Sequence, residues 1–163
     1  MPGLARLLQV FPASLSRDDP EAPTRGAPMT ARDIMTANPI VVSGQVTVAE
    51  AAEIIRESDI RHLPVVDDGI LVGMLSDRDL RSTVFGVEGF DSPRAWFSTP
   101  VCRLMSPDVI CVGPETELGE VIAAMIQTKV GAIPVIDPLT REVLGIVSYI
   151  DVLEAAQDLV EEA

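Results

Sequence analysis

Two short stretches, Ser76–Asp79 and Ser148–Asp151, place a carboxylate three residues after a hydroxyl. Each stretch follows a short apolar run and precedes a helix-like pattern, so each is predicted to be a strand-to-helix corner. A carboxylate at such a corner can accept two hydrogen bonds from a cis-diol. The first turn of the helix offers free backbone amides and a partial positive charge to a phosphate. Both corners are therefore chemically suited to a ligand that carries a diol and a phosphate.

The same spacing also has a purely structural interpretation. A Ser-x-x-Asp sequence before an apolar run is an N-terminal capping box, in which hydroxyl and carboxylate satisfy free amides of the first turn. Taken alone, the motif favours this capping role over ligand binding. Choosing between the capping role and ligand binding therefore requires evidence from the rest of the sequence.

The two corners belong to an internal repeat. The segment Asp33–Asp67 aligns with Arg103–Asp137 without a gap, and apolar positions agree almost throughout. After a short insertion in the second copy, the corner positions align as well, namely Gly73, Ser76 and Asp79 with Gly145, Ser148 and Asp151. Two copies are too few for a solenoid, so we expect a pseudo-symmetric pair of units.

Each copy is predicted to fold as strand–helix–strand–strand–helix, which makes the chain an α/β (α+β) protein, and the sheets of the two units are expected to pack on each other. The expected strands are Ile40–Val42, Leu63–Val66 and Ile70–Leu75, then Ile110–Val112, Ile133–Ile136 and Val143–Val147. Thr47 and Glu50 predict a capping box, and Asp67-Asp68-Gly69 predicts a hairpin turn. Helical spacing gives two apolar faces: Val48, Ala51, Ala52 and Ile55, then Leu118, Val121, Ile122 and Met125. A last helix is expected from Tyr149.

The remaining segments complete the predicted organisation. Residues 1–28 contain five prolines and are expected to form a flexible arm, with at most one helical turn over Leu4–Val10. The first unit is predicted at 29–82, a connector at 83–100, the second unit at 101–158 and an acidic tail at 159–163. The connector is expected to be packed, covering the core between the units rather than binding a partner, because it holds four of the six aromatic residues: Phe85, Phe90, Trp96 and Phe97.

Composition narrows the function classes. The formal net charge of −13 argues against nucleic acid and against an anionic membrane surface as partners. No apolar run approaches the length of roughly 18 residues that suggests a transmembrane helix, and no convincing targeting signal opens the chain. Cys102 and Cys111 have no metal-like spacing, so both are expected to be buried free thiols, which is consistent with the cytoplasm.

Enzymatic interpretations have little support in the sequence. The single histidine, His62, has no serine or cysteine at a strained elbow that could complete a triad. A Gly-x-x-x-x-Gly-Lys loop is absent, and one histidine with two cysteines makes no metal set. We therefore expect no catalytic residue, no metal site and no enzymatic activity.

The chain resembles the cystathionine beta-synthase (CBS) domain family, in the tandem arrangement called the Bateman module. The resemblance is carried by Asp33-Ile34-Met35-Thr36 with Arg103-Leu104-Met105-Ser106, by Arg61–Asp67 with Gly131–Asp137, and by the two corners. It covers about residues 30–158. Each motif is weak by itself, but their order, repeated twice, is specific.

The resemblance implies a regulatory module that binds AMP, ADP, ATP or S-adenosylmethionine in clefts between the paired domains. It assigns the ribose to Asp79 and Asp151, the phosphates to the side of Ser76 and Ser148, and the adenine to backbone near Ile40 and Ile110. The ligand-binding set is completed by Arg61, His62, Thr36, Pro64, Arg78 and Pro134. It implies no obligatory cofactor, optional Mg with the nucleotide, a homodimer and an unknown regulated protein. The alternative is a structural interaction module with vestigial clefts.

The two sites are not expected to be equal. Arg78 precedes Asp79 in the first corner, where the second has Ile150. Arg61 and His62 become Gly131-Ala132 in the second copy. By family analogy, Arg61 and His62 could reach phosphates at the site that contains Asp151. Plainer roles stay open: a salt bridge for Arg61, a solvated helix start for Arg78, and packing or simple exposure for His62.

Overall fold

The computed structural model describes residues 8–10, 28–84, 95 and 97–161. These residues divide into two compact units. Unit 1 is formed by Pro39–Val109, and unit 2 by Leu8–Asn38 together with Ile110–Ala163. Each unit is one β-sheet with helices packed against it, so the predicted mixed α/β class is confirmed.

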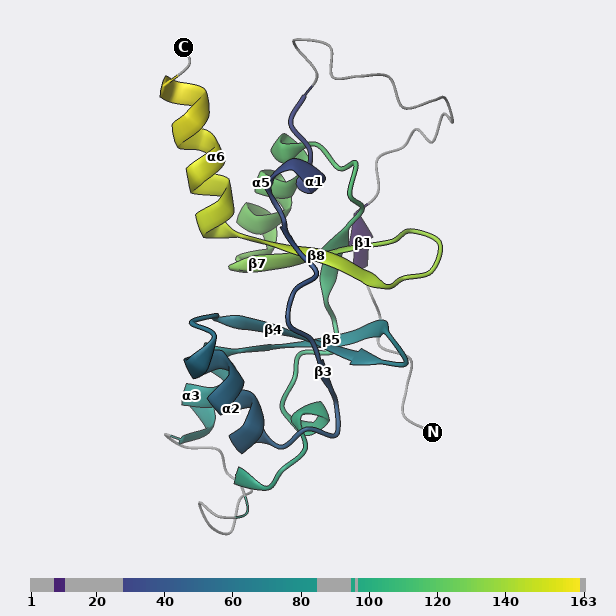
Figure 1. The fold of residues 1–163 in the computed structure, drawn as a ribbon, viewed down its shortest axis with the longest axis vertical. Helices are drawn as coiled ribbons and strands as arrows, with labels where there is room; N and C mark the ends of the chain where they lie inside the picture. The colour runs from purple at the N-terminus through teal and green to yellow at the C-terminus, as the bar shows by residue number, and fades with distance from the viewer. Residues whose placement is uncertain (1–7, 11–27, 85–94, 96, 162–163) are drawn as a thin grey trace. The chain divides into compact units, whose positions relative to one another are not determined.

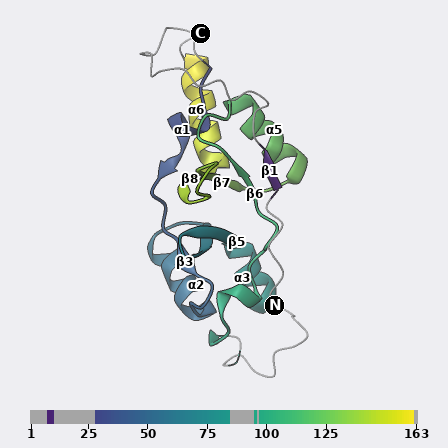
Figure 2. The ribbon, with the colours of Figure 1, turned by 90° about the vertical axis from the view of Figure 1, so that its right-hand side faces the viewer.

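Unit 1 contains a three-stranded sheet in the order β3-β4-β5. Its strands are β3 (Val42–Ser43), β4 (His62–Asp67) and β5 (Ile70–Ser76), with β3 parallel and β5 antiparallel to β4. Helices α2 (Val48–Glu57) and α3 (Asp77–Val84) lie on one side of this sheet in Figures 1 and 2. A short 3-10 turn, η1 (Val101–Arg103), also belongs to the unit.

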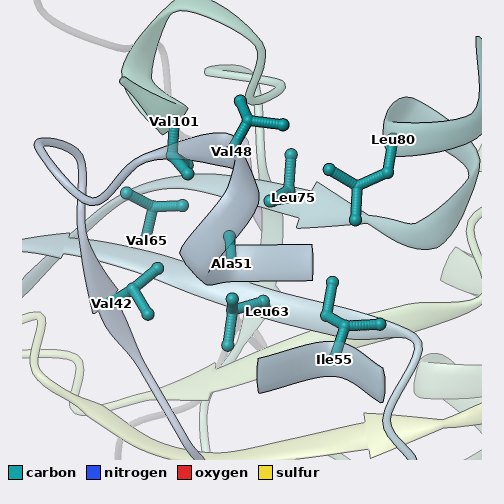
Figure 3. Close-up of a cluster of buried hydrophobic side chains, with 9 residues drawn as sticks. All are labelled: Val42, Val48, Ala51, Ile55, Leu63, Val65, Leu75, Leu80 and Val101. Atoms are coloured by element: carbon teal, nitrogen blue, oxygen red, sulfur yellow. The ribbon is translucent and has the colours of Figure 1, made fainter. Parts of the chain in front are cut away.

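The core of unit 1 lies between α2 and the sheet (Figure 3). Helix α2 begins at the predicted capping box, since the Thr47 hydroxyl accepts a hydrogen bond from the Glu50 amide and Glu50 accepts one from the Thr47 amide. From that start, helical spacing directs Val48, Ala51 and Ile55 inward. They meet the other buried members of the cluster, which are Val42, Leu63, Val65, Leu75, Leu80 and Val101.

The predicted Asp-Gly hairpin is confirmed. Asp68 and Gly69 join β4 to β5, and both have positive φ, 48° and 81°. Positive φ at both central residues is the geometry of a two-residue turn that matches the twist of its flanking strands. The turn pairs Asp67 with Ile70, and a one-residue register shift between Val65 and Val66 then places His62 opposite Ser76.

Unit 2 contains a five-stranded sheet in the order β1-β6-β7-β8-β2. Its strands are β1 (Leu8–Val10), β2 (Thr36–Ala37), β6 (Ile110–Val112), β7 (Ala132–Ile136) and β8 (Val143–Ser148). Helices α1 (Ala31–Ile34), α5 (Leu118–Thr128) and α6 (Tyr149–Glu161) lie on one side of it in Figures 1 and 2. Strands β7 and β8 repeat the hairpin of β4 and β5.

The segment before the first strand of each sequence copy belongs to the other copy's unit. Strand β2 pairs antiparallel with β8, placing Thr36 opposite Ile146. Ser106, the counterpart of Thr36, forms the matching bridge with Met74 on β5. The compact units therefore differ from the sequence repeat: residues 29–38 lie in unit 2, and residues 101–109 lie in unit 1.

Several local predictions were wrong. Strand β3 begins at Val42, whereas Ile40 and Val41, expected in a buried strand, are 45% and 38% exposed. Leu8–Val10 forms a strand parallel to β6 instead of a helical turn, because the edge of β6 offers it backbone partners. Pro28, at the end of the predicted arm, is exposed, and residues 1–7 and 11–27 lie outside the described residues.

Two further side chains are more exposed than expected. Cys102 is exposed on η1, while Cys111 is buried as predicted. Phe97, one of the four connector aromatics, is 50% exposed. The other three aromatics lie outside the described residues.

Candidate ligand-binding corners

The first corner lies where β5 ends and α3 begins. The backbone amide and the hydroxyl of Ser76 both donate to Oδ2 of Asp79, at 2.8 and 2.6 Å. The Asp79 amide in turn donates to the Ser76 hydroxyl at 3.3 Å. Both residues are half-buried. The predicted capping interaction is thus present at the first candidate site.

The second corner, between β8 and α6, repeats this geometry. The Ser148 amide and hydroxyl both donate to Oδ2 of Asp151 at 2.6 Å, and the Asp151 amide donates to the hydroxyl at 3.4 Å. The backbone approach is the same as well. The first helical amide, of Tyr149, donates to the Gly131 carbonyl at 3.0 Å, as the Asp77 amide donates to the Arg61 carbonyl at 3.0 Å.

Capping geometry alone does not mark a ligand site in this chain. Thr30 with Asp33 at α1, and Thr47 with Glu50 at α2, form capping boxes of the same kind, although neither pair was a candidate. At Asp33 the hydrogen bonds from Thr30 lower the pKa of the carboxyl group. What sets the two corners apart is their place at the end of each hairpin and the side chains around them.

Charged and titratable groups surround the first corner. His62 pairs with Ser76 across the hairpin and is half-buried. Burial lowers the pKa of His62, while the nearby carboxylates of Asp77 and Asp79 act in the opposite direction. Arg78 is exposed on the first turn of α3. The basic residues singled out from the sequence therefore gather beside Asp79 in unit 1.

The side chains at the corresponding positions around the second corner carry no charge. Ala132 takes the place of His62, pairs with Ser148 across the hairpin and is buried. Tyr149 and Ile150 occupy the positions of Asp77 and Arg78, and they are 38% and 45% exposed. The two corners therefore differ in their side chains and share their backbone geometry, while their inequality as ligand sites stays a prediction.

The remaining predicted site residues fall into two groups. In unit 1, Pro64 is buried on β4 opposite Met74, and Ile40 is exposed before β3. In unit 2, Thr36, Ile110 and Pro134 lie on three strands of one sheet. Thr36 and Pro134 both pair with Ile146, two residues before Ser148, so these two lie beside the second corner.

Sequence reasoning missed a methionine–glycine contact behind each corner. A Cβ atom at Gly73 would lie 2.9 Å from Cγ of Met105 and closer still to its sulfur, and a Cβ at Gly145 would meet Met35 in the same way. Real Cβ atoms essentially never approach so closely, so only glycine fits while the methionine keeps its position. All four residues are identities of the repeat, and that was the available signal.

In the described part of the chain, no three His, Cys, Asp or Glu side chains gather in a way that could hold a metal ion. No helix among the described residues is both long and apolar enough to cross a bilayer.

The family model of the CBS domain matches residues 31–86 and 101–158. The CBS domain-containing protein YhcV of Bacillus subtilis is 33% identical over 122 residues, which cover 74% of this chain and 80% of the relative.

Two solved structures are similar to the chain over nearly their full length. CBSX2, a CBS-pair protein of Arabidopsis thaliana, was solved in complex with AMP. It is 30% identical with a TM-score of 0.69, and the match covers 80% of this chain and 98% of that one. The CBS domain pair of the protein MJ0100, in complex with 5′-methylthioadenosine and S-adenosyl-L-methionine, is 26% identical with a TM-score of 0.70, over 81% and 98%. The chain belongs to the CBS domain family, as a tandem pair of CBS domains.

Proposed function

We propose that this chain is a regulatory module that binds an adenosine-containing ligand at one or both Ser-x-x-Asp corners. The ligand class comprises AMP, ADP, ATP and S-adenosylmethionine. One observation carries the proposal: the same corner geometry recurs in both units of a chain whose structural relatives were solved with AMP, or with 5′-methylthioadenosine and S-adenosyl-L-methionine. That the ligand lies in clefts between the paired domains stays a prediction.

Asp79 and Asp151 are assigned to the ribose. Their capping bonds to the preceding serine are all accepted by Oδ2. A carboxylate has about four acceptor positions on its two oxygens. Capping of this kind uses only part of that capacity, and the cap holds the carboxylate in a fixed orientation. Capping and ligand binding are compatible at these corners.

Phosphate recognition is assigned to the basic side chains beside the first corner. Arg61 and Arg78 lie close enough to His62 to lower its pKa, so the three basic groups share one neighbourhood. A phosphate there would meet two guanidinium groups and the first amides of α3. The second corner, with Tyr149 and Ile150, suits the uncharged part of an adenosine ligand. The alternative assignment, in which Arg61 and His62 reach phosphates at the site of Asp151 and only Arg78 serves the first corner, stays a prediction.

Regulation would follow from unequal binding to two conformations. A ligand shifts a conformational equilibrium by no more than the difference between its affinities for the two states. We propose that the module is not an enzyme and acts on a separate protein. The identity of that protein, an accompanying Mg²⁺ ion and the cytoplasmic location stay predictions.

The test is calorimetric titration with AMP, ADP, ATP and S-adenosylmethionine. Wild type is compared with Asp79→Ala and Asp151→Ala. A hydrogen bond to a charged group contributes about 1.5–3 kcal/mol, so the variant at an occupied corner should bind about 10- to 100-fold more weakly. Arg78→Ala should weaken ATP more than S-adenosylmethionine if the first corner holds phosphates.

Glu50→Ala is the matched control, because it removes a capping box of the same geometry at a helix with no candidate site. It should leave affinity unchanged. If none of the four ligands binds folded wild type, the proposal fails and the alternative of a structural interaction module gains support. That alternative has one observation in its favour, namely that capping boxes of the same kind occur at α1 and α2.

A further inference from the structure

The two units differ at one edge of their sheets. In unit 2, strand β1 lies beside β6 and pairs with it in parallel, Leu8–Val10 with Ile110–Val112 (Figure 2). In unit 1, the counterpart of β6 is β3, which is an edge strand and pairs only with β4 among the described strands. Unit 1 therefore has an open strand edge at the position where unit 2 has an additional strand.

The open edge of unit 1 exposes apolar side chains. We call residues Ile40–Ser43 the β3 edge. Ile40 is 45% and Val41 is 38% exposed. Their counterparts in unit 2 lie next to β1, and there Ile110 is half-buried and Cys111 is buried. The same segment of the repeat is therefore less exposed in the unit where an additional strand lies beside it.

The β3 edge lacks the features that usually keep a strand edge unpaired. Because no described strand lies on its outer side, backbone groups on that side have no partner in the sheet. Proteins commonly protect such an edge with charged side chains or with proline. From Ile40 to Gln45 the sequence contains neither a charged residue nor a proline. The β3 edge is therefore suited to pairing with an additional extended segment.

Strand β1 indicates which kind of segment fits such an edge. Its sequence is Leu-Gln-Val, and it runs parallel to β6. Successive side chains of a strand point to opposite faces, so Leu8 and Val10 lie on the same face. By the repeat, a segment with this pattern would run parallel to β3 and place its apolar residues opposite Ile40 and Val42. Since β1 itself is already paired with β6, another protein has to supply this segment.

The charge of the chain further restricts the partner. The formal net charge is −13, so a segment with basic residues beside its apolar ones is attracted to the chain, whereas an acidic segment is repelled. In recognition by strand addition, main-chain hydrogen bonds provide the affinity and alternate side chains provide the specificity. The β3 edge therefore fits a basic, extended segment with apolar residues at alternate positions.

We propose that the β3 edge is a docking site for such a segment of another protein. The segment adds to the sheet of unit 1 as a fourth strand, parallel to β3, as β1 does to β6 in unit 2. This inference goes beyond adenosine binding and does not depend on it. It assigns a protein-binding surface to unit 1, on the opposite edge of the sheet from β5.

Nuclear magnetic resonance of the full chain, without nucleotide, tests this assignment. The probe is a synthetic peptide with the sequence of residues 5–11, Ala-Arg-Leu-Leu-Gln-Val-Phe, which contains the β1 sequence and one arginine. It should shift the backbone amide signals of Ile40–Ser43 in a saturable way. Tethering gives β1 a high effective concentration at β6, so the free peptide should leave the signals of Ile110–Val112 unchanged. The control peptide, with Leu8→Asp and Val10→Asp, should not bind.

Two variants of the chain make the test specific to the β3 edge. Val41→Lys should weaken peptide binding about fivefold, because the peptide can no longer cover an exposed apolar side chain there. Ile70→Lys is the matched control, since Ile70 is 41% exposed on β5, at the other edge of the sheet. It should leave the affinity unchanged. Ile40 is not substituted, because its backbone is assigned to the adenine.

Three results would overturn the proposal. The first is the absence of signal shifts at Ile40–Ser43 on addition of the peptide. The second is a set of shifts confined to Ile110–Val112, which would mean that the peptide only exchanges with β1. The third is equal weakening by Val41→Lys and Ile70→Lys. Because no nucleotide is present, each of these results is separate from the calorimetric test of adenosine binding.

Discussion

The contact between Gly73 and Met105 predicts a steric penalty that can be measured and then relieved. A Cβ at Gly73 would lie 2.9 Å from Cγ of Met105. Overpacking of this kind costs about 1–3 kcal/mol, and Gly→Ala recovers about 0.4–1 kcal/mol by restricting the unfolded chain. The middle values of the two ranges give a net loss of about 1.3 kcal/mol in the free energy of unfolding for Gly73→Ala.

The penalty should depend on the methionine side chain. Met105→Ala removes both Cγ and the sulfur, so the double variant Gly73→Ala/Met105→Ala should be more stable than the sum of the two single changes predicts. Urea unfolding followed by circular dichroism gives the four free energies of this cycle. The counterpart pair, Gly145 and Met35 in unit 2, is an independent repeat of the experiment, because a Cβ there would lie 2.8 Å from Cγ of Met35.

Two results would refute this reasoning. One is a Gly73→Ala variant as stable as wild type, which would mean that Met105 moves aside at no cost. The other is strict additivity in both cycles, which would place the cause of any loss elsewhere in the hairpin.

Two further predictions concern single side chains. Cys102 is exposed, whereas Cys111 is buried and desolvation raises its pKa to about 11. A thiol-alkylating reagent should therefore label Cys102 in the folded protein and Cys111 only after denaturation. Equal labelling rates of the two cysteines in the folded protein would contradict this. Burial lowers the pKa of His62 below its usual value of 6.5, so the unfolded chain binds this proton more tightly, and the free energy of unfolding should rise with pH in the interval just below 6.5. His62→Gln should flatten that rise, and an unchanged slope in the variant would assign it to other groups.

Local features of the fold were largely predictable from sequence because they depend on neighbouring residues. The cap at Thr47 and the turn at Asp68-Gly69 each need only a few consecutive side chains, and both are present. The apolar spacing of α2 likewise identified its buried face. The hydrogen bonds between Ser76 and Asp79 were also predictable from their spacing. The sequence could not show whether that spacing serves helix capping or ligand binding.

Features that depend on distant residues were not predictable. Ile40 and Val41 are as apolar as Val42, but only Val42 reaches the sheet, since the strand begins where β4 offers a partner. Cys102 looked like a core residue, yet the 3-10 turn buries its neighbour Val101 instead. The exchange of the segments before each first strand has no local signal at all.

That exchange fixes an order of events during synthesis of the chain. The bridge between Met74 and Ser106 joins positions that are made soon after one another, whereas Thr36 is made long before its partner Ile146. Domains generally fold as units while the chain is made from its N-terminus. All residues of Pro39–Val109, which form unit 1, are therefore available for folding once Val109 has emerged from the ribosome. Strand β2 emerges earlier, but it can pair with β8 only after β8 has been synthesised.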